Sequence, residues 1–389
     1  MATANLVTCF LSILLMMMLF SSSLAFINVV TLGAKPDGKT DATSSFLKAW
    51  TLACSSVNPQ TIYIPTGNFL IKPAVFRGPC KNRMVVRIDG TLLAPSDYRV
   101  LGSSTNWLLF VKITGLSVIG GTLNAQGATY WACKNAGKSC PAGARSITFN
   151  YADNVVINGL TSINSQLTHV VINRCNNVMV KGVKIVAPDQ SPNTDGIHVQ
   201  FSSGVTITSS SIKTGDDCVS IGPGAKNLLI DRVSCGPGHG ISIGSLGKGA
   251  NEQGVQNVTV KNSVLTGTDN GLRIKSWARP STGFVTGVLY RNIVMNKVKN
   301  PIIIDQNYCP SNNCPNQSSG VKIKEVTYQN IQGTSTTQVA VNFECSSSNP
   351  CRGIRLQGVK LTYVNGIATS SCSNAGGTAV GVNTLKSCL

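Results

Sequence analysis

Charged and aromatic residues are scarce in this chain of 389 residues, at 12% and 6% of the sequence. Few aromatic residues beside many Val, Ile, Thr, Ser, Asn and Gly favour short strands joined by tight turns over a helix bundle. A hydrophobic content of 42% excludes a disordered chain, and no glycine period indicates collagen. After residue 25, no run is long and apolar enough to cross a bilayer.

The first 25 residues predict a signal peptide. They carry no charged side chain, and residues 10–20 are apolar except for Ser12. Small residues then lead to Ala25, after which we expect cleavage, so residues 26–389 form the mature protein. An uncleaved anchor is the alternative, but the apolar run is shorter than the ~20 residues that a membrane span needs. We therefore expect secretion.

The cysteines are consistent with an oxidising compartment. Of 14 cysteines, Cys9 lies in the predicted signal peptide, which leaves an odd number. Neighbours in the sequence predict six bridges and leave Cys175 as a buried thiol. The predicted pairs are Cys54–Cys80, Cys133–Cys140, Cys218–Cys235, Cys309–Cys314, Cys345–Cys351 and Cys372–Cys388. No cysteine and histidine spacing fits a zinc site. Asn257 and Asn316 begin glycosylation sequons.

The net charge of +18 indicates either an anionic partner or an ordinary basic surface. Nucleic acid is not expected, because the basic residues are dispersed, aromatic residues are few and the chain is predicted to be exported. An acidic polysaccharide outside the cell fits these features better.

A short pattern recurs along the chain, in which Asn or Gly precedes apolar-x-apolar. Copies begin at Gly115, Asn154, Asn177, Gly204, Asn227, Asn257, Gly287, Gly320 and Gly353. From Asn154 onward the steps are 23, 27, 23, 30, 30, 33 and 33 residues. The alternation with period two predicts half-buried strands, and no helical period separates the copies. Repeats of this length indicate a solenoid or a propeller.

A second strand family lies between these copies and has apolar residues at its third and fifth positions. Its members begin at Asp195, Asp217, His239, Asn270 and Asn300. One strand of each family per coil predicts an all-β chain, a single right-handed parallel β-helix. A propeller is the alternative, but its blades recur at about 40–50 residues, which is longer than these steps.

The shared register of the second family predicts a column of polar side chains. Asp195, Asp217 and His239 occupy the same position in consecutive coils, and Asp216 directly precedes Asp217. Because equivalent residues of stacked strands lie about 4.8 Å apart, these groups should meet on one face. Only 15 acidic residues and 3 histidines exist in the chain, so chance is a poor explanation. On the next strand, Arg273 and Lys275 should point outward.

This column suits glycoside hydrolysis, which needs one protonated carboxyl and one ionised carboxylate. Crowding raises the cost of ionising every carboxyl, so one of them keeps its proton. Arg273 and Lys275 could bind an anionic substrate group. Taken singly, these residues have simpler interpretations, since Asp195 fits a turn, Asp216 and Asp217 fit a turn or a calcium site, and His239 fits a loop.

Four motifs, found in order, resemble those of the glycoside hydrolase family that contains the polygalacturonases. They are Asn193-Thr194-Asp195, Gly215-Asp216-Asp217, Gly238-His239-Gly240 and Arg273-Ile274-Lys275, with Tyr308 following. The resemblance covers essentially the whole mature chain, and plant members are most similar. It implies a pectin-lyase-like solenoid that hydrolyses α-1,4-galacturonan of the cell wall with inversion, as a monomer and without a cofactor or a metal.

The resemblance also implies individual roles. Asp216 is expected to be the general acid, Asp195 and Asp217 to position and deprotonate water, and His239 to support the acid. The residues expected to bind the substrate are Asn193, Arg273, Lys275 and Tyr308. Three alternatives remain: a calcium-dependent pectate lyase, a wall-binding protein without catalysis, and a rhamnogalacturonan hydrolase. The sequence leaves endo and exo attack open.

Overall fold

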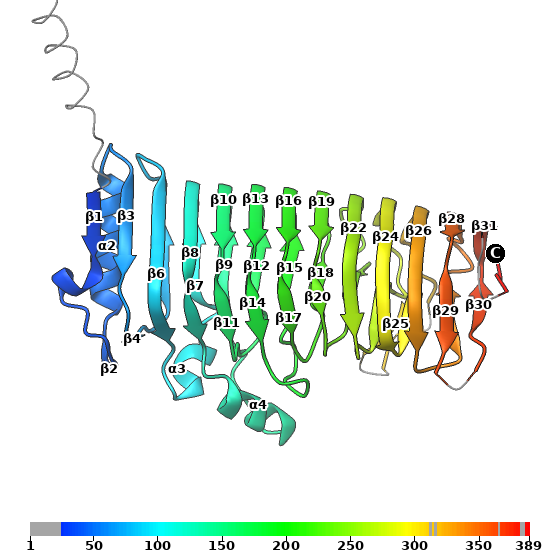
Figure 1. Cartoon of the computed structure of the whole chain (residues 1–389), viewed down its shortest axis with the longest axis horizontal. Coiled ribbons are helices and arrows are strands. Elements are labelled where there is room, and N and C mark those ends of the chain that lie inside the picture. The colour runs from blue at the N-terminus through cyan, green and yellow to red at the C-terminus, as the bar shows by residue number, and fades with distance from the viewer. Residues whose placement is uncertain (1–24, 311–312, 315–316, 365, 382–385) are drawn as a thin grey trace, which may run out of the picture.

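The computed structural model describes residues 25–310, 313–314, 317–364, 366–381 and 386–389, and these form a right-handed parallel β-helix (Figure 1). The predicted fold class is therefore confirmed. The predicted signal peptide lies outside the described residues except for Ala25, and Asn316 lies outside them too. Among the described residues, none of the helices has the length and apolar character that crossing a membrane requires.

Two parallel sheets wind around the axis, and most coils contribute two strands or one bent strand to the larger sheet and one strand to the smaller. The larger sheet has 20 strands: β1 (Ala25–Asn28), β2 (Asp37–Asp41), β3 (Gln60–Ile64), β4 (Asn68–Leu70), β6 (Met84–Leu93), β8 (Thr114–Asn124), β10 (Asp153–Asn158), β11 (Thr161–Ile163), β13 (Asn176–Lys181), β14 (Lys184–Val186), β16 (Ser203–Thr208), β17 (Ser211–Lys213), β19 (Lys226–Asp231), β20 (Ser234–Cys235), β22 (Val255–Thr266), β24 (Phe284–Val298), β26 (Lys322–Ser335), β28 (Cys351–Gln357), β29 (Lys360–Tyr363) and β31 (Ala375–Val380). The smaller sheet has 11: β5 (Ala74–Arg77), β7 (Asn106–Val111), β9 (Arg145–Asn150), β12 (Val170–Asn173), β15 (Ile197–Gln200), β18 (Val219–Ile221), β21 (Ile241–Leu246), β23 (Asn270–Trp277), β25 (Asn300–Tyr308), β27 (Val339–Glu344) and β30 (Thr369–Ser373).

The core is a stack of equivalent side chains from successive coils. In the smaller sheet Ile197 pairs with Val219, and Val219 pairs with Ile241. All three are fully buried. The third and fifth positions of the second strand family therefore face the core as predicted, and the residues between them face outward.

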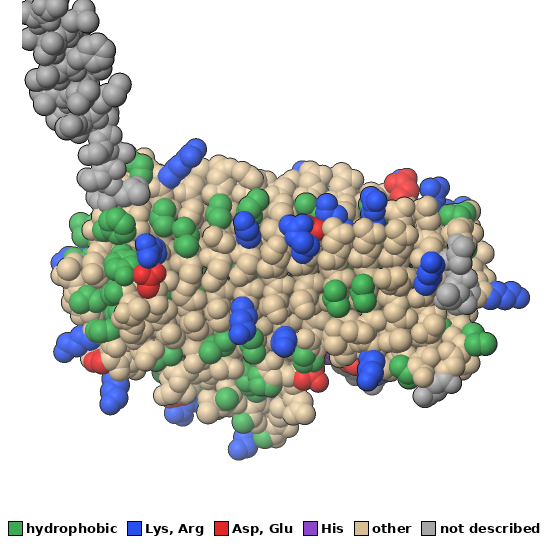
Figure 2. Space-filling view, viewed as in Figure 1, with side chains coloured by type: hydrophobic (Ala, Val, Ile, Leu, Met, Phe, Trp, Pro, Cys, Tyr) green, Lys and Arg blue, Asp and Glu red, His purple; other side chains and the backbone are tan. Residues whose placement is uncertain are grey.

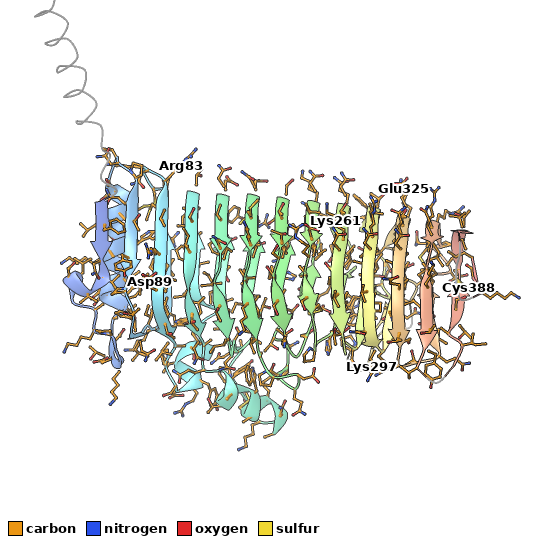
Figure 3. All side chains as sticks on the ribbon, in the orientation of Figure 1. Arg83, Asp89, Lys261, Lys297, Glu325 and Cys388 are labelled. Atoms are coloured by element: carbon orange, nitrogen blue, oxygen red, sulfur yellow. A yellow bond between two sulfur atoms is a disulfide. The ribbon has the colours of Figure 1, made fainter. Side chains whose placement is uncertain are left out.

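One copy of the first pattern was placed wrongly. Thr286 pairs with Lys324 and Val288 with Val326, so the residue opposite Gly287 is Glu325 and not Gly320. Glu325 has a φ of 59° and lies near the start of β26 (Figure 3). Additional residues after β25, which include the Cys309–Cys314 loop, lengthen this coil. Gly320 precedes Val321, which is buried but lies outside β26. The two residues therefore match the start of the sequence pattern without beginning a strand.

Asparagines within the long strands β22, β24 and β26 form a ladder along the outside of the coils. Asn292 donates to Asn262 Oδ1 at 3.1 Å and accepts from Asn330 Nδ2 at 3.1 Å. All three have φ between 51° and 54°. Asparagine tolerates this left-handed backbone better than other non-glycine residues, because its short amide can form local hydrogen bonds. The same conformation occurs at Asn154 and Asn177, which open copies of the first pattern and form a similar contact, with Asn177 donating to Asn154 Oδ1 at 2.6 Å; the left-handed backbone explains why Asn or Gly opens so many copies.

Short helices interrupt the strand pattern, contrary to the prediction that none separates the copies. They are the 3₁₀ turn η1 (Val29–Leu32), α2 (Thr43–Ser55), α3 (Tyr98–Gly102) and α4 (Ala128–Asn135). Helix α4 lies between the copies at Gly115 and Asn154, and it is too short to give a clear helical period. Helix α2 covers the N-terminal end of the solenoid, where Phe46 contacts Phe69 and Trp50 contacts Phe76 (Figure 1).

All six predicted disulfides are present, and Cys175 is a buried free thiol. The last bridge joins Cys372 to Cys388 near the C-terminal end (Figure 3). Lys and Arg side chains are spread over the visible face and do not form one patch (Figure 2). This distribution agrees with the dispersed charge that the sequence shows.

We predict that Asn292→Ala lowers the free energy of unfolding by ~1–2 kcal/mol and that Asn292→Gly lowers it less. Alanine loses two hydrogen bonds and must adopt the left-handed backbone, whereas glycine loses only the bonds. Denaturant-induced unfolding measures both changes. Equal losses would show that the left-handed conformation at residue 292 costs alanine nothing.

Candidate active site

The ladder of the smaller sheet brings the predicted column together. Ile197, Val219 and Ile241 are in register on three successive coils. The residues two positions before them are Asp195, Asp217 and His239, so these three side chains also lie on successive coils. Backbone hydrogen bonds fix this alignment, since Gly196 N donates to Asp217 O at 2.9 Å and His239 N donates to Asp216 O at 2.8 Å.

Asp217 is the most deeply buried of the three carboxyl groups, at 2% exposure. Ser242 Oγ donates to its Oδ1 at 2.6 Å, and Lys275 Nζ donates to its Oδ2 at 2.7 Å. Burial opposes the charge of Lys275, but the charge and hydrogen bond of Asp217 outweigh burial and raise the pKa of Lys275. Both oxygens of Asp217 accept hydrogen bonds, which is the pattern of an ionised carboxylate.

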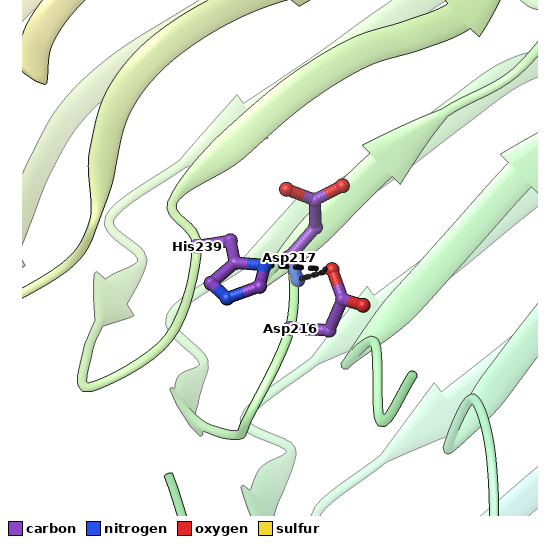
Figure 4. Close-up of side chains that lie close together, drawn as sticks. All are labelled: Asp216, Asp217 and His239. Atoms are coloured by element: carbon purple, nitrogen blue, oxygen red, sulfur yellow. Dashed lines mark hydrogen bonds and ion pairs between the residues drawn. The ribbon is translucent and has the colours of Figure 1, made fainter. Parts of the chain in front are cut away.

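Asp216 pairs with His239 (Figure 4). His239 Nδ1 lies 3.1 Å from Asp216 Oδ1, which also accepts from Asp217 N at 2.7 Å. The hydrogen bond to Asp216 is the main cause that raises the pKa of His239. Burial favours the neutral form of Asp216, but the hydrogen bond and charge of His239, with the charge of Lys275, lower the pKa of Asp216 below its usual value. The pair therefore holds its proton on the imidazole.

Asp195 has a different environment. Its partner is Ser220, whose Oγ donates to Asp195 Oδ2 at 2.6 Å and lies 2.8 Å from His198 Nδ1. Since Ser220 donates to Asp195, Nδ1 of His198 carries the hydrogen in the other contact. Burial, followed by the charges of Asp216 and Asp217, raises the pKa of Asp195 to about 8. The surroundings of these carboxyl groups thus differ, since the pKa of Asp195 is raised and that of Asp216 is lowered.

Arg273, Lys275 and Tyr308 adjoin this cluster. Arg273 forms an ion pair with Asp305 Oδ2 at 3.1 Å, and its guanidinium lies 5.2 Å from the ring centre of Tyr308. Lys275 Nζ lies 5.3 Å from the same ring centre, and Trp277 contacts the ring edge-on. Both cations therefore have a carboxylate partner on the protein before any substrate binds.

A cleft of about 370 Å³ joins these side chains. Its lining includes Asp195, Asp216, Asp217, Lys275 and Tyr308, and Asn193 lies exposed at its edge with a φ of 56°. Of the predicted residues, only Arg273 and His239 are outside this lining, and they adjoin it through Tyr308 and Asp216. One acceptor or donor atom each of Asp216, Asp217 and His239 lies within 4.8 Å of the others, close enough for a cation. However, the Lys275 ammonium already pairs with Asp217 at that position.

Sequence reasoning missed four groups that contact the predicted residues, namely His198, Ser220, Ser242 and Asp305. The first three occupy the fourth, outward-facing position of the second strand family, next to the core residues of the same strands. Extending the alternation of that family by one column would have identified them. No repeat marks Asp305, because its role depends on the side-chain direction of Arg273.

Sequence comparisons show which known proteins this chain is similar to. The family model described as "Glycosyl hydrolases family 28" matches residues 54–384. A polygalacturonase of Prunus persica is 56% identical over 95% of this chain and 98% of its own length. An exopolygalacturonase of Platanus acerifolia is 43% identical over 91% of this chain and 95% of its own length.

Two solved structures extend the comparison. The polygalacturonase of Erwinia carotovora has 27% identity and a TM-score of 0.67, and covers 94% of this chain and 97% of its own. The endo-xylogalacturonan hydrolase of Aspergillus tubingensis has 21% identity and a TM-score of 0.80, and covers 92% of this chain and 100% of its own. The latter likeness concerns the fold alone.

We predict that Lys275→Met lowers the free energy of unfolding by ~3 kcal/mol, because it leaves the buried Asp217 carboxylate without its counter-charge. The double variant Lys275→Met with Asp217→Asn should recover part of this loss, since it removes the unpaired charge. Unfolding of both single variants and the double variant by denaturant at neutral pH gives the coupling between the two residues. Additive losses would show that the pair contributes no coupling to stability.

Proposed function

From the premise that the chain belongs to family 28 of the glycosyl hydrolases, we propose that it is a polygalacturonase, a glycoside hydrolase that cleaves α-1,4-galacturonosidic bonds of pectin. The observation that supports this most is the cluster of three carboxyl groups around an open cleft, with Lys275 in the lining of the cleft and Arg273 beside Tyr308. An acidic polymer also suits the net charge of +18.

In this proposal Asp216 is the general acid and works together with His239. As the glycosidic bond breaks, negative charge develops on the leaving oxygen, and Asp216 protonates it. The imidazolium of His239 supplies the proton through its contact with Asp216 Oδ1. The raised pKa of His239 stores this proton over a range in which an isolated aspartic acid would have lost it.

Water attacks from the side of Asp195 and Asp217. Asp217 removes the proton, because Ser242 and Lys275 hold its carboxylate in the ionised form. Asp195 positions the water, and the Ser220–His198 pair orients Asp195 in turn. The sugar is bound by Arg273, Tyr308 and Asn193. Lys275 contacts both the substrate carboxylate and Asp217.

Inversion rests on the family resemblance and not on carboxyl spacing. Inverting enzymes commonly separate their carboxyl groups by about 6.5–9.5 Å, whereas one oxygen each of Asp216 and Asp217 lies within 4.8 Å of the other. The anomeric configuration of the first product, followed by NMR, tests the stereochemistry directly. An α-configured first product would contradict inversion.

Secretion and a monomeric state also belong to this proposal. The apolar segment before Ala25 and the six disulfides support export to an oxidising compartment. None of the reported relatives favours the calcium-dependent lyase.

The test of this function is the release of reducing ends from polygalacturonate. We expect reducing ends without a product that absorbs in the ultraviolet, and we expect activity to persist in a chelator. An unsaturated product that disappears with chelator would establish the lyase. Polygalacturonate binding without any product would establish the wall-binding protein.

We predict that Asp216→Asn lowers kcat on polygalacturonate by roughly 10²–10⁴-fold with an unchanged melting temperature, because the amide cannot donate the acid proton. The matched control is Asp189→Asn, an exposed aspartate outside the cluster, which should retain activity. An Asp216→Asn variant with near wild-type turnover would refute the acid role.

We predict that His239→Gln moves the alkaline limb of the kcat profile toward acid by about one pH unit or more. In the wild type the Asp216–His239 pair keeps its proton until the pH rises through the raised pKa of His239. In the variant the proton must reside on Asp216, and an aspartic acid releases it at lower pH. Initial rates on polygalacturonate across pH measure the limb, and an unmoved limb would show that His239 stores no catalytic proton.

A further inference from the structure

The catalytic cleft continues toward the N-terminal end of the solenoid. A neighbouring groove of about 550 Å³ shares Asn193, Asp195, His198 and Gln200 with the site already described. Its other walls come from β7, β9 and β12 and from the loop before β12. The two hollows are therefore one continuous cleft with Asp195 near its middle. We call the part beyond Asp195 the N-terminal arm.

Arg145 extends the catalytic column into this arm. Ile147 pairs with Val170, and Val170 pairs with Ile197. Arg145 and Asp195 each lie two positions before these paired residues, so Arg145 occupies the same column two coils earlier. Two coil spacings correspond to roughly 10 Å. A substrate that contacts both Asp195 and Arg145 must therefore span about 10 Å along the axis.

The charge of Arg145 is available to a ligand. Its backbone N donates to Thr105 O at 3.1 Å, and the residue is half-buried in the groove wall. In the part of the chain that the structure describes, no carboxylate lies within ion-pair distance of its guanidinium, unlike Arg273 and Lys275. Arg145 lines the groove together with His198, so its charge adjoins the space that a ligand would occupy.

The rest of the arm has the chemistry of a sugar-binding surface. Asn150, Asn173 and Gln200 form a second outward column in register. Asn173 donates to Asn150 Oδ1 at 2.7 Å, and the amides of all three residues line the groove, where they can bind sugar hydroxyls. Leu109, which is half-buried, adds apolar surface to the groove in the neighbouring column, where it pairs with Thr148.

We propose that the N-terminal arm binds further galacturonate residues of the substrate and that Arg145 binds the carboxylate of one of them. This inference rests on the proposed polygalacturonase function. A guanidinium matches a carboxylate with two parallel hydrogen bonds, which a neutral sugar cannot supply. Because the cleft extends on both sides of Asp195, a polymer can lie across it, and cleavage then occurs within the chain rather than at its end.

The test is a comparison of substrate lengths. Wild type, Arg145→Gln and Arg145→Lys are assayed for kcat/KM on trigalacturonate and hexagalacturonate. We expect Arg145→Gln to lower the hexamer-to-trimer ratio by about tenfold or more, as expected for the loss of a charge-assisted contact. The ratio for Arg145→Lys should lie between the ratios of wild type and Arg145→Gln, because lysine keeps the charge but cannot form two parallel hydrogen bonds with a carboxylate. The ratio within one variant does not depend on its folded fraction.

Lys138→Gln is the matched control, since Lys138 is exposed and outside the lining of the groove. It removes the same charge and should leave the ratio unchanged. An Arg145→Gln ratio equal to that of wild type, or an equal fall for Lys138→Gln, would overturn the role of Arg145. Failure of the wild type to cleave either oligomer would instead refute the proposed function itself.

Discussion

The in-register stacking of parallel coils is the constraint on which the rest of this structure depends. Each strand is held by backbone hydrogen bonds to its equivalents before and after it, so one position in the repeat becomes a line of side chains along the axis. Lines that point inward make the core, and lines that point outward make the asparagine ladders and the cleft. Residues far apart in sequence, such as Asp195 and Lys275, thereby adjoin the same cleft without any special loop.

Within the cleft, chemically similar groups acquire different properties from their immediate neighbours. Asp217 faces an ammonium and a hydroxyl, Asp216 faces an imidazole, and Asp195 faces only a hydroxyl while the other two charges repel its own. Aspartates on adjacent coils thus acquire opposite shifts, with the pKa of Asp195 raised and that of Asp216 lowered. The stacking places them, and the outward residues of the same strands decide which of them is ionised.

The sequence was sufficient for the fold, the column of polar residues and the six disulfides, because these follow from periodicity and from proximity along the chain. It was insufficient where the coil length changes. The copy assigned to Gly320 actually begins at Glu325. A glycine before alternating apolar residues fits several registers, and only the strand pairing shows which one is correct. Helix α4 is too short for a helical period. The pairing of Arg273 with Asp305 depends on side-chain direction, which no spacing encodes.

The unequal lengths of the coils have an evolutionary consequence. Strand pairing resumes after each connecting segment, whether that segment is a tight turn or carries a helix such as α4. Insertions and deletions in these segments can therefore accumulate while the aligned aspartates keep their places. A lineage can therefore remodel the walls of the cleft without displacing the residues aligned along it.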